Sequence, residues 1–302
     1  MADDLQRVFL WGVPRSMSTA LLKCLSFADG IQILNQPYAV AHYIGPKAER
    51  PEPNPNDALL TKIVAVHERV RKESDMSEVE GIDYRLMSKE WIRDHLLEAP
   101  YPGKKVFLCR EQAQYLHGRY DLLPKGFKYS FLIRHPYKVF RSLKKFLTQI
   151  YGDFPDMRAL PPLAFPPGAC FKELFDLVEY VRENVDPHPT ILDADDLLHD
   201  PEGILSAYCT RMGIPYSSKL LTWEAGDKIT SRWVKIKGVG VANKAQGFYR
   251  HAFESECFEK PTPVPDPASL QKDVRACAEM SMGYYESLHR ERIKASADTE
   301  EP

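Results

Sequence analysis

The chain has 302 residues, of which 44% are hydrophobic and 27% charged, a balance typical of globular proteins. A formal net charge of −2 and a pI near 6.5 argue against binding to nucleic acid or to an anionic membrane surface. The cysteines are scattered without a CxxC pair, no apolar run is long enough to span a membrane, and the N-terminal MADDLQR lacks the features of a signal peptide. We therefore expect a cytoplasmic protein with reduced thiols.

Apolar runs alternate along the chain with segments of helical spacing. The runs predict buried strands at 7–12, 31–34, 104–109, 128–134 and 189–194. The helical patterns fall at 18–27, at 137–150, between Asp200 as N-cap and Gly213 just past the helix end, and at about 268–294. This alternation predicts an α/β fold, a three-layer sandwich whose mostly parallel central sheet is flanked by helices. We expect one domain over 1–294 and a frayed polar tail over 295–302.

The first strand runs into the first helix through the turn GVPRSMST, residues 12–19. Helix N-termini expose unpaired N–H groups, and together with the helix dipole these favour an anion. Ser16, Ser18 and Thr19 add hydroxyl donors, and Arg15 adds a planar cation. The turn therefore favours a phosphate-like group at the carboxyl end of the strand, although an ordinary capped helix has the same hydroxyls.

The turn has the length of the nucleotide-triphosphate P-loop GxxxxGK[ST] but not its chemistry. Counted from Gly12, the lysine position holds Ser18 and the Ser/Thr position holds Thr19. The lysine that would reach the β- and γ-phosphates is absent, and Arg15 lies three residues earlier. This difference disfavours a P-loop kinase or NTPase, which stays open as an alternative function.

A second strand-to-helix turn lies in FLIRHPYKVFRSL, residues 131–143. Arg134 ends the strand, Pro136 opens the helix, and Ser142 lies two turns further on. An arginine with a nearby hydroxyl suits a second dianion, while a structural ion pair is the common alternative for a single arginine. Two such turns on one sheet favour a ligand with two anionic groups.

In this order and spacing the two turns resemble the motifs of sulfotransferases that use 3′-phosphoadenosine 5′-phosphosulfate (PAPS), closest to a P-loop sulfotransferase-like branch. The matching segments span most of residues 7–258 and include NQPY at 35–38 and CREQAQYL at 109–116. The resemblance implies a P-loop-containing nucleotide-binding fold and sulfuryl transfer from PAPS to a hydroxyl or amine of a small-molecule acceptor, without a metal. It implies that the phosphosulfate is held by Pro14, Arg15, Ser16, Met17, Ser18 and Thr19, and the 3′-phosphate by Arg134 and Ser142.

The resemblance extends weakly to the late basic segment WVKIKGVGVANKAQGFYR, residues 233–250, which matches a loop over the 3′-phosphate. It adds Lys235, Lys237 and Gly238 as cofactor-binding candidates, with a solvated basic loop as the alternative. Arg15 is also expected to act in catalysis, by stabilising the leaving 5′-phosphate.

The base that takes the acceptor proton is the uncertain part of the resemblance. Gln36 stands where the branch often has a glutamate, and an amide does not titrate. Glu111, at the end of the third strand, is the first candidate, with Tyr115 and His135 as weaker ones. Glu111 could instead only pair with Arg110 or Arg15. A non-catalytic nucleotide-binding protein therefore stays a second alternative, and the oligomeric state stays open, a homodimer being one option.

Two further features have a functional and a structural interpretation. The proline-rich stretches 45–56 and 152–168 are either surface loops or loops on the substrate side. Asp193, Asp195 and Asp196 could resemble a Mg²⁺ site, but they fit better as the end of a strand and the start of a turn. We expect no metal site.

Overall fold

The computed structural model describes residues 5–54, 56–76, 80–237 and 249–295. Its centre is a sheet with the strand order β2-β3-β1-β4-β5, and all its pairings are parallel. The strands are β1 (Gln6–Gly12), β2 (Ile31–Asn35), β3 (Val106–Glu111), β4 (Lys128–Ile133) and β5 (Thr190–Asp193). The five predicted strands are confirmed, with ends that differ by one or two residues.

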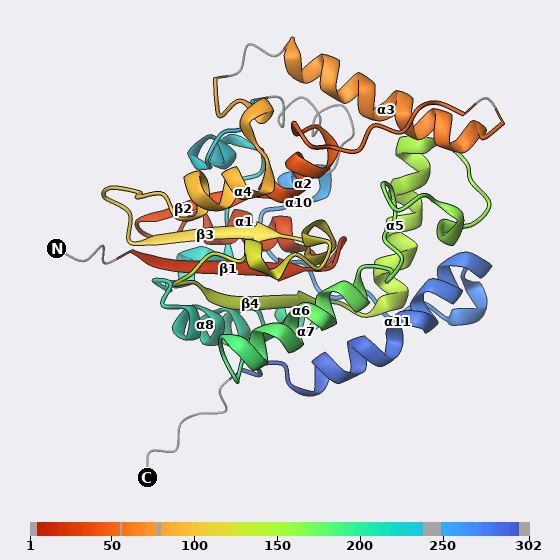
Figure 1. The fold of residues 1–302 in the computed structure, drawn as a ribbon. Helices are drawn as coiled ribbons and strands as arrows, with labels where there is room; N and C mark the ends of the chain where they lie inside the picture. Colours follow the sequence, from red (N-terminus) through yellow and green to blue (C-terminus); the bar gives the residue numbers. More distant parts are fainter. Residues whose placement is uncertain (1–4, 55, 77–79, 238–248, 296–302) are drawn as a thin grey trace.

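Helices follow the strands as the alternation predicted (Figure 1). The helices are α1 (Ser18–Leu25), α2 (Pro37–Tyr43), α3 (Ala58–Asp75), α4 (Lys89–Ile92), α5 (Pro136–Tyr151), α6 (Phe171–Asn184), α7 (Ala194–His199), α8 (Pro201–Met212), α10 (Arg250–Glu254) and α11 (Lys272–Arg290). Asp200 accepts a hydrogen bond from the Gly203 amide as the N-cap of α8, and Gly213 ends that helix with a φ of 71°, as predicted.

The sheet is covered on both faces, because alternate side chains of each strand point to opposite sides. Phe9 and Trp11 of β1 pack into the layer that holds α2, α5, α6 and α11. Val8 and Leu10 pack into the layer that holds α1, α7 and α8. The predicted α/β three-layer fold with a parallel sheet is therefore confirmed.

All five strands end at the same edge of the sheet, and α3 and α5 extend beyond that edge (Figure 1). In parallel α/β sheets this edge is where ligands bind. No helix in the described part of the chain is long and apolar enough to cross a membrane.

Candidate functional site

A cavity of about 410 Å³ opens at the carboxyl edge of the sheet. Its walls come from segments that are distant in the sequence: the turn after β1, helix α2, the middle of α3, the second half of α5, and the chain after α10. Five of the six residues predicted to bind at the first turn line it: Pro14, Arg15, Met17, Ser18 and Thr19. Arg134 and Ser142 of the second turn line the same cavity.

The first turn has an unusual backbone. Arg15 and Met17 both have a positive φ, 60° and 67°, which non-glycine residues adopt uncommonly. Met17 is the N-cap of α1 but makes no side-chain capping bond, so the first N–H groups of the helix are left without a side-chain cap. Strained turns of this kind concentrate at ligand sites, and alternating backbone conformations make concave anion-binding surfaces.

Ser16 differs from its neighbours in this turn. Its side chain is fully buried and its hydroxyl donates to the Val13 carbonyl at 2.7 Å. Ser16 is not among the described residues that line the cavity. Its hydroxyl therefore holds the turn in shape, and the structure does not bring it to the place where the sequence predicted a ligand contact.

Three guanidinium groups surround one end of the cavity, and they come from neighbouring strands. Arg15 follows β1, Arg110 is the penultimate residue of β3, and Arg134 follows β4. Burial lowers the pKa of Arg15, and the charges of Arg134 and Arg110 lower this pKa further. Such a cluster of like charges in a partly desolvated site is stabilised when an anion enters it.

Arg110 is the member of this cluster that the sequence analysis did not select. Its side chain is only 4% exposed, and burial lowers its pKa. Its Nε has no hydrogen-bond partner among the described residues, and the same is true of Arg134 Nε. A buried cationic donor without a hydrogen-bond partner is costly in free energy. An arginine near the end of the apolar run VFLCRE is therefore a feature of the sequence that indicates a ligand site.

Contacts between the two turns hold the arginines in place. Arg134 Nη1 donates to the Arg15 carbonyl at 3.1 Å, and Arg15 Nε donates to Ser142 Oγ at 3.0 Å. Asp195 lies behind Arg134, with its Oδ1 3.8 Å from Arg134 Nε and its Oδ2 2.8 Å from Lys138 Nζ. The two predicted anion-binding turns therefore form one continuous wall.

Glu111, the first candidate for the base, points away from this wall. Its Oε2 accepts from the amides of Tyr38 and Ala39 at 2.7 and 3.0 Å, and its Oε1 accepts from the Gln112 amide at 2.8 Å. The side chain is fully buried, and burial raises its pKa to about 7. Glu111 is not among the described cavity-lining residues, and no described ion pair joins it to Arg110 or Arg15. It caps the start of α2.

The two weaker base candidates differ in whether they line the cavity. Tyr115 lines the cavity, and its hydroxyl is 3.1 Å from that of Tyr43. His135 is the N-cap of α5, where its Nδ1 accepts from the Tyr137 amide, and the described cavity walls do not include it. Gln36 lines the cavity with a φ of 56°, and its Oε1 accepts from the Tyr249 hydroxyl at 2.6 Å.

The late basic segment contributes less than predicted. Lys235 and Lys237 pair with Ile82 through their backbones, at 2.8 and 2.9 Å, and neither is among the described residues that line the cavity. Gly238 lies outside the described residues. The segment that does reach the cavity is the one around α10, which includes Tyr249, Ala252 and Ser255.

A buried lysine attaches that segment to the first helix. Lys23 of α1 is 1% exposed, and its ammonium donates to the carbonyls of Ala252, Phe253 and Ser255 at 3.2, 3.0 and 2.9 Å. These bonds satisfy carbonyls at the end of α10. Helix α1, which begins at the first turn, therefore also holds α10, whose Ala252 lines the cavity.

The far end of the cavity is apolar. It is lined by Val40 and Ile44, by Val66 and Val70 of α3, by Leu143, Leu147 and Ile150 of α5, and by Ala164, Phe165 and Pro166. The proline-rich stretch 152–168 therefore reaches the site, whereas no described residue of 45–56 lines it. Helix α3 was not predicted from the sequence, yet it closes this end.

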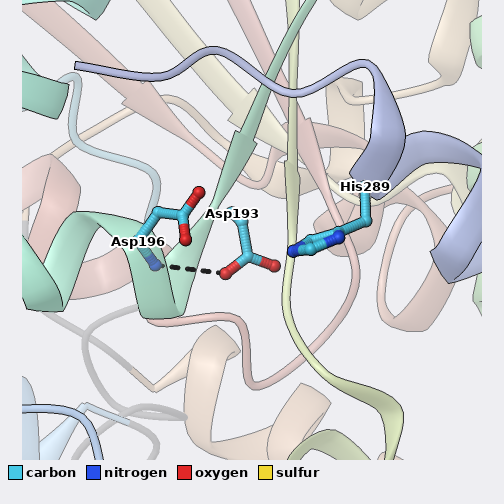
Figure 2. A group of neighbouring side chains, drawn as sticks. All are labelled: Asp193, Asp196 and His289. Atoms are coloured by element: carbon cyan, nitrogen blue, oxygen red, sulfur yellow. Dashed lines mark hydrogen bonds between the residues drawn. The ribbon is translucent and has the colours of Figure 1, made fainter. Parts of the chain in front are cut away.

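The acidic group at the end of β5 has a structural explanation (Figure 2). Ligand-type atoms of Asp193, Asp196 and His289 lie within 4.8 Å of one another. Asp193 Oδ1 accepts from the amides of Asp195 and Asp196 as the N-cap of α7, and Tyr285 donates to its Oδ2 at 3.1 Å. Asp196 Oδ2 accepts from Arg292 Nε at 2.5 Å. Protein donors thus occupy these carboxylates. Asp193 ends β5 as predicted, but a helix, α7, follows it in place of the predicted turn, and Asp195 and Asp196 lie in the first turn of that helix.

Fold and site define an α/β protein with a cavity at the carboxyl edge of a parallel sheet, cationic at one end and apolar at the other. No family model matches the chain. Two Arabidopsis thaliana proteins resemble it: branched-chain-amino-acid aminotransferase-like protein 2, 27% identical over 72% of this chain and 32% of that protein, and protein 1, 23% identical over 84% and 37%. The chain spans about a third of the length of these relatives.

Solved structures with a similar arrangement carry sulfotransferase titles. The sulfotransferase domain from the curacin biosynthetic pathway is 15% identical and aligns over 90% of this chain and 95% of its own, with a TM-score of 0.43. The sulfotransferase domain of the Synechococcus PCC 7002 olefin synthase is 17% identical over 90% and 93%, with a TM-score of 0.43. A sulfotransferase from Alicyclobacillus acidocaldarius is 12% identical over 76% and 89%, with a TM-score of 0.44.

Proposed function

We propose that this chain transfers a sulfuryl group from PAPS to a hydroxyl or amine of a small-molecule acceptor. The observation that carries the proposal is the convergence of Arg15, Arg110 and Arg134 on one end of the cavity. Two of these arginines, Arg110 and Arg134, have a buried Nε without a hydrogen-bond partner among the described residues, which fits a ligand rich in anionic oxygens. The two matching turns support a ligand with two separate anionic groups.

Each arginine has a distinct role in the proposal. Arg15, Arg110 and the amides at the start of α1 hold the phosphosulfate, with Ser18 and Thr19 as further donors. Arg134 and Ser142 hold the 3′-phosphate. Because Arg15 bonds to Ser142, the two anionic groups of the ligand would lie on either side of the Arg15 side chain.

In the transfer, the bond between sulfur and the bridging phosphate oxygen breaks while the acceptor oxygen or nitrogen bonds to sulfur. Negative charge grows on the leaving phosphate, and the proton of the acceptor passes to solvent water. The work of the protein in such a loose displacement is positioning and electrostatic stabilisation. Arg15 and Arg110 are fixed cations next to the developing charge, so little reorganisation is needed when the reaction occurs.

Direct binding tests the proposal before any acceptor is known. We expect adenosine 3′,5′-bisphosphate to bind more tightly than adenosine 5′-phosphate in calorimetric titrations, because only the bisphosphate reaches Arg134. Incubation with ³⁵S-labelled PAPS and a metabolite extract should then yield a labelled product without added Mg²⁺. Equal affinity for the two nucleotides would contradict the proposal, and Mg²⁺-dependent ATP hydrolysis by the pure protein would support a P-loop kinase or NTPase.

A second candidate is a protein that binds the nucleotide without transferring the sulfuryl group. The position of Glu111 favours it, because this carboxylate accepts three backbone bonds at the start of α2 and does not line the cavity, whereas the uncharged Gln36 and Gln112 do. Tight binding of the bisphosphate without a labelled product from any acceptor would support this candidate. We propose no aminotransferase activity, because the chain spans only about a third of the relatives that carry that name.

A further inference from the structure

The apolar end of the cavity has walls that suit one kind of molecule. Aliphatic side chains of α3 and α5 face it, among them Val66, Val70, Leu147 and Ile150. A charged group placed against such side chains would lose its hydration without gaining a partner. An uncharged apolar body gains free energy there in proportion to the area it buries.

Four aromatic residues that line the cavity pair their polar atoms with one another. The hydroxyls of Tyr43 and Tyr115 are 3.1 Å apart, and His67 Nε2 is 3.1 Å from the Tyr151 hydroxyl. Burial lowers the pKa of His67 to about 4, so its ring is neutral at pH 7. These four aromatic residues therefore present apolar ring surface to the cavity, because their polar atoms have partners.

The size of the cavity limits the ligand as well. A volume of about 410 Å³ lies toward the lower end of the range of roughly 300–1,000 Å³ found for ligand sites, and the cationic end takes part of it. We infer that the apolar end is the acceptor subsite and that it takes a small, neutral, apolar alcohol. That the bound molecule is the sulfuryl acceptor rests on the proposed function. The class of molecule, small, neutral and apolar, rests only on the walls of the cavity.

Three compounds that share a phenol ring and differ in charge test the inference. They are 4-ethylphenol, which is neutral, tyramine, which carries an ammonium, and 3-(4-hydroxyphenyl)propionate, which carries a carboxylate. We expect 4-ethylphenol to bind at least about tenfold more tightly than either charged analogue in calorimetric titrations of the whole chain. Equal or tighter binding of a charged analogue would overturn the inference, and so would the absence of binding by all three.

Paired variants on α3 locate the bound compound. Val66 faces the cavity, whereas Ala65 beside it is exposed. Val66→Asp should weaken binding of 4-ethylphenol roughly 10- to 100-fold, and Ala65→Asp should leave it unchanged. Val66→Ala adds no charge and should weaken binding about three- to tenfold, which keeps the test decisive if Val66→Asp does not fold. Unchanged binding in both Val66 variants would place the compound elsewhere and overturn the inference.

The bisphosphate titration separates this inference from the proposed function. One outcome is that 4-ethylphenol binds, its binding weakens in the Val66 variants, and the bisphosphate does not bind. This outcome would support the apolar subsite and contradict the proposed sulfuryl transfer. The other outcome is that the bisphosphate binds and only a charged analogue binds at the apolar end. This outcome would support the proposed transfer and contradict the inference that the acceptor is neutral.

Discussion

Arg15 and Ser142 are 127 positions apart in the sequence, and Arg15 Nε donates to Ser142 Oγ at 3.0 Å. The bond joins the turn after β1 to the helix after β4, across neighbouring strands. The Arg15 guanidinium also lies over the Phe146 ring, 5.3 Å from its centroid. Two contacts with α5 thus fix the orientation of a side chain whose backbone already has a positive φ.

Removing this hydroxyl should loosen Arg15 without changing the charge of the site. We expect Ser142→Ala to weaken binding of adenosine 3′,5′-bisphosphate about 5- to 15-fold. This factor corresponds to the lower end of the free energy that a charge-assisted hydrogen bond contributes. Thr148→Val, on the same helix outside this cavity, is the control and should bind as wild type. Calorimetric titration measures both, and equal affinity for wild type and Ser142→Ala would show that the bond does not prepare the site.

Arg110 offers a prediction in which stability and binding change in opposite directions. In the free protein its buried Nε has no partner among the described residues. Arg110→Met keeps most of the side-chain volume and removes the unpaired charge, so the free energy of unfolding should rise by about 1–3 kcal/mol. Affinity for the bisphosphate should fall at least about tenfold.

Denaturant unfolding and calorimetric titration check the two parts of this prediction. Arg141→Met, which removes an exposed arginine of α5, should change neither quantity. A variant at Arg110 that loses stability and keeps its affinity would make Arg110 a structural residue.

Arg134 tests whether the site distinguishes two phosphates from one. Its side chain lies between the Arg15 carbonyl and Asp195 and lines the cavity. Arg134→Ala should weaken binding of the bisphosphate roughly 10- to 150-fold, since a charge-assisted bond is worth about 1.5–3 kcal/mol. Binding of adenosine 5′-phosphate should be nearly unchanged. Similar losses for the two nucleotides would mean that Arg134 supports the fold of the turn.

Glu111 is predicted to act on stability more than on the chemical step. A glutamine at this position has one carbonyl oxygen for three backbone donors, and its amide N–H groups would face the remaining donor. Glu111→Gln should therefore lower the free energy of unfolding by about 1–3 kcal/mol. The exposed Glu183→Gln should not. If Glu111 is the base instead, kcat should fall roughly 10²- to 10⁴-fold at unchanged stability.

His67 should make the fold sensitive to acid. Burial lowers its pKa from 6.5 to about 4, so between these values the unfolded chain binds a proton that the folded chain does not. The contribution to stability is present above pH 6.5 and is lost as the pH falls toward 4. At pH 4.5 the loss should be about 2–3 kcal/mol smaller in His67→Gln than in wild type.

Urea unfolding at pH 7 and pH 4.5 measures this difference for His67→Gln and for the exposed control His188→Gln. Other buried groups also titrate as the pH falls, among them His42, Glu111 and Asp193. His42, with a pKa also lowered by burial to about 4, adds a loss in the same direction, whereas Glu111, with a pKa raised to about 7, adds stability as the pH falls. Glu111 is the same in each variant and cancels in the comparison, whereas the charge of His67 is itself one cause of the lowered His42 pKa, so part of the difference reports this coupling. An identical pH dependence in His67→Gln and wild type would contradict the prediction.

The sequence by itself determined the elements and the order in which they meet the edge of the sheet. Alternating apolar runs and helical spacing are local patterns, so they located the five strands, the capped helix from Asp200 to Gly213 and the turns that carry Arg15 and Arg134. Because parallel strands end at one edge, the sequence also placed both turns at the carboxyl edge of one sheet. In the structure both turns line the same cavity.

Only the tertiary structure decided which way the side chains at that edge point. Neighbouring residues of a strand face opposite sides of the sheet, so Arg110 reaches the cavity while Glu111 turns back to the amides of α2. This alternation was visible in the sequence, but which face holds the ligand was not. The apolar wall from α3 is a further example, because an amphipathic helix acquires its neighbour only when the chain packs, through contacts that no local pattern encodes.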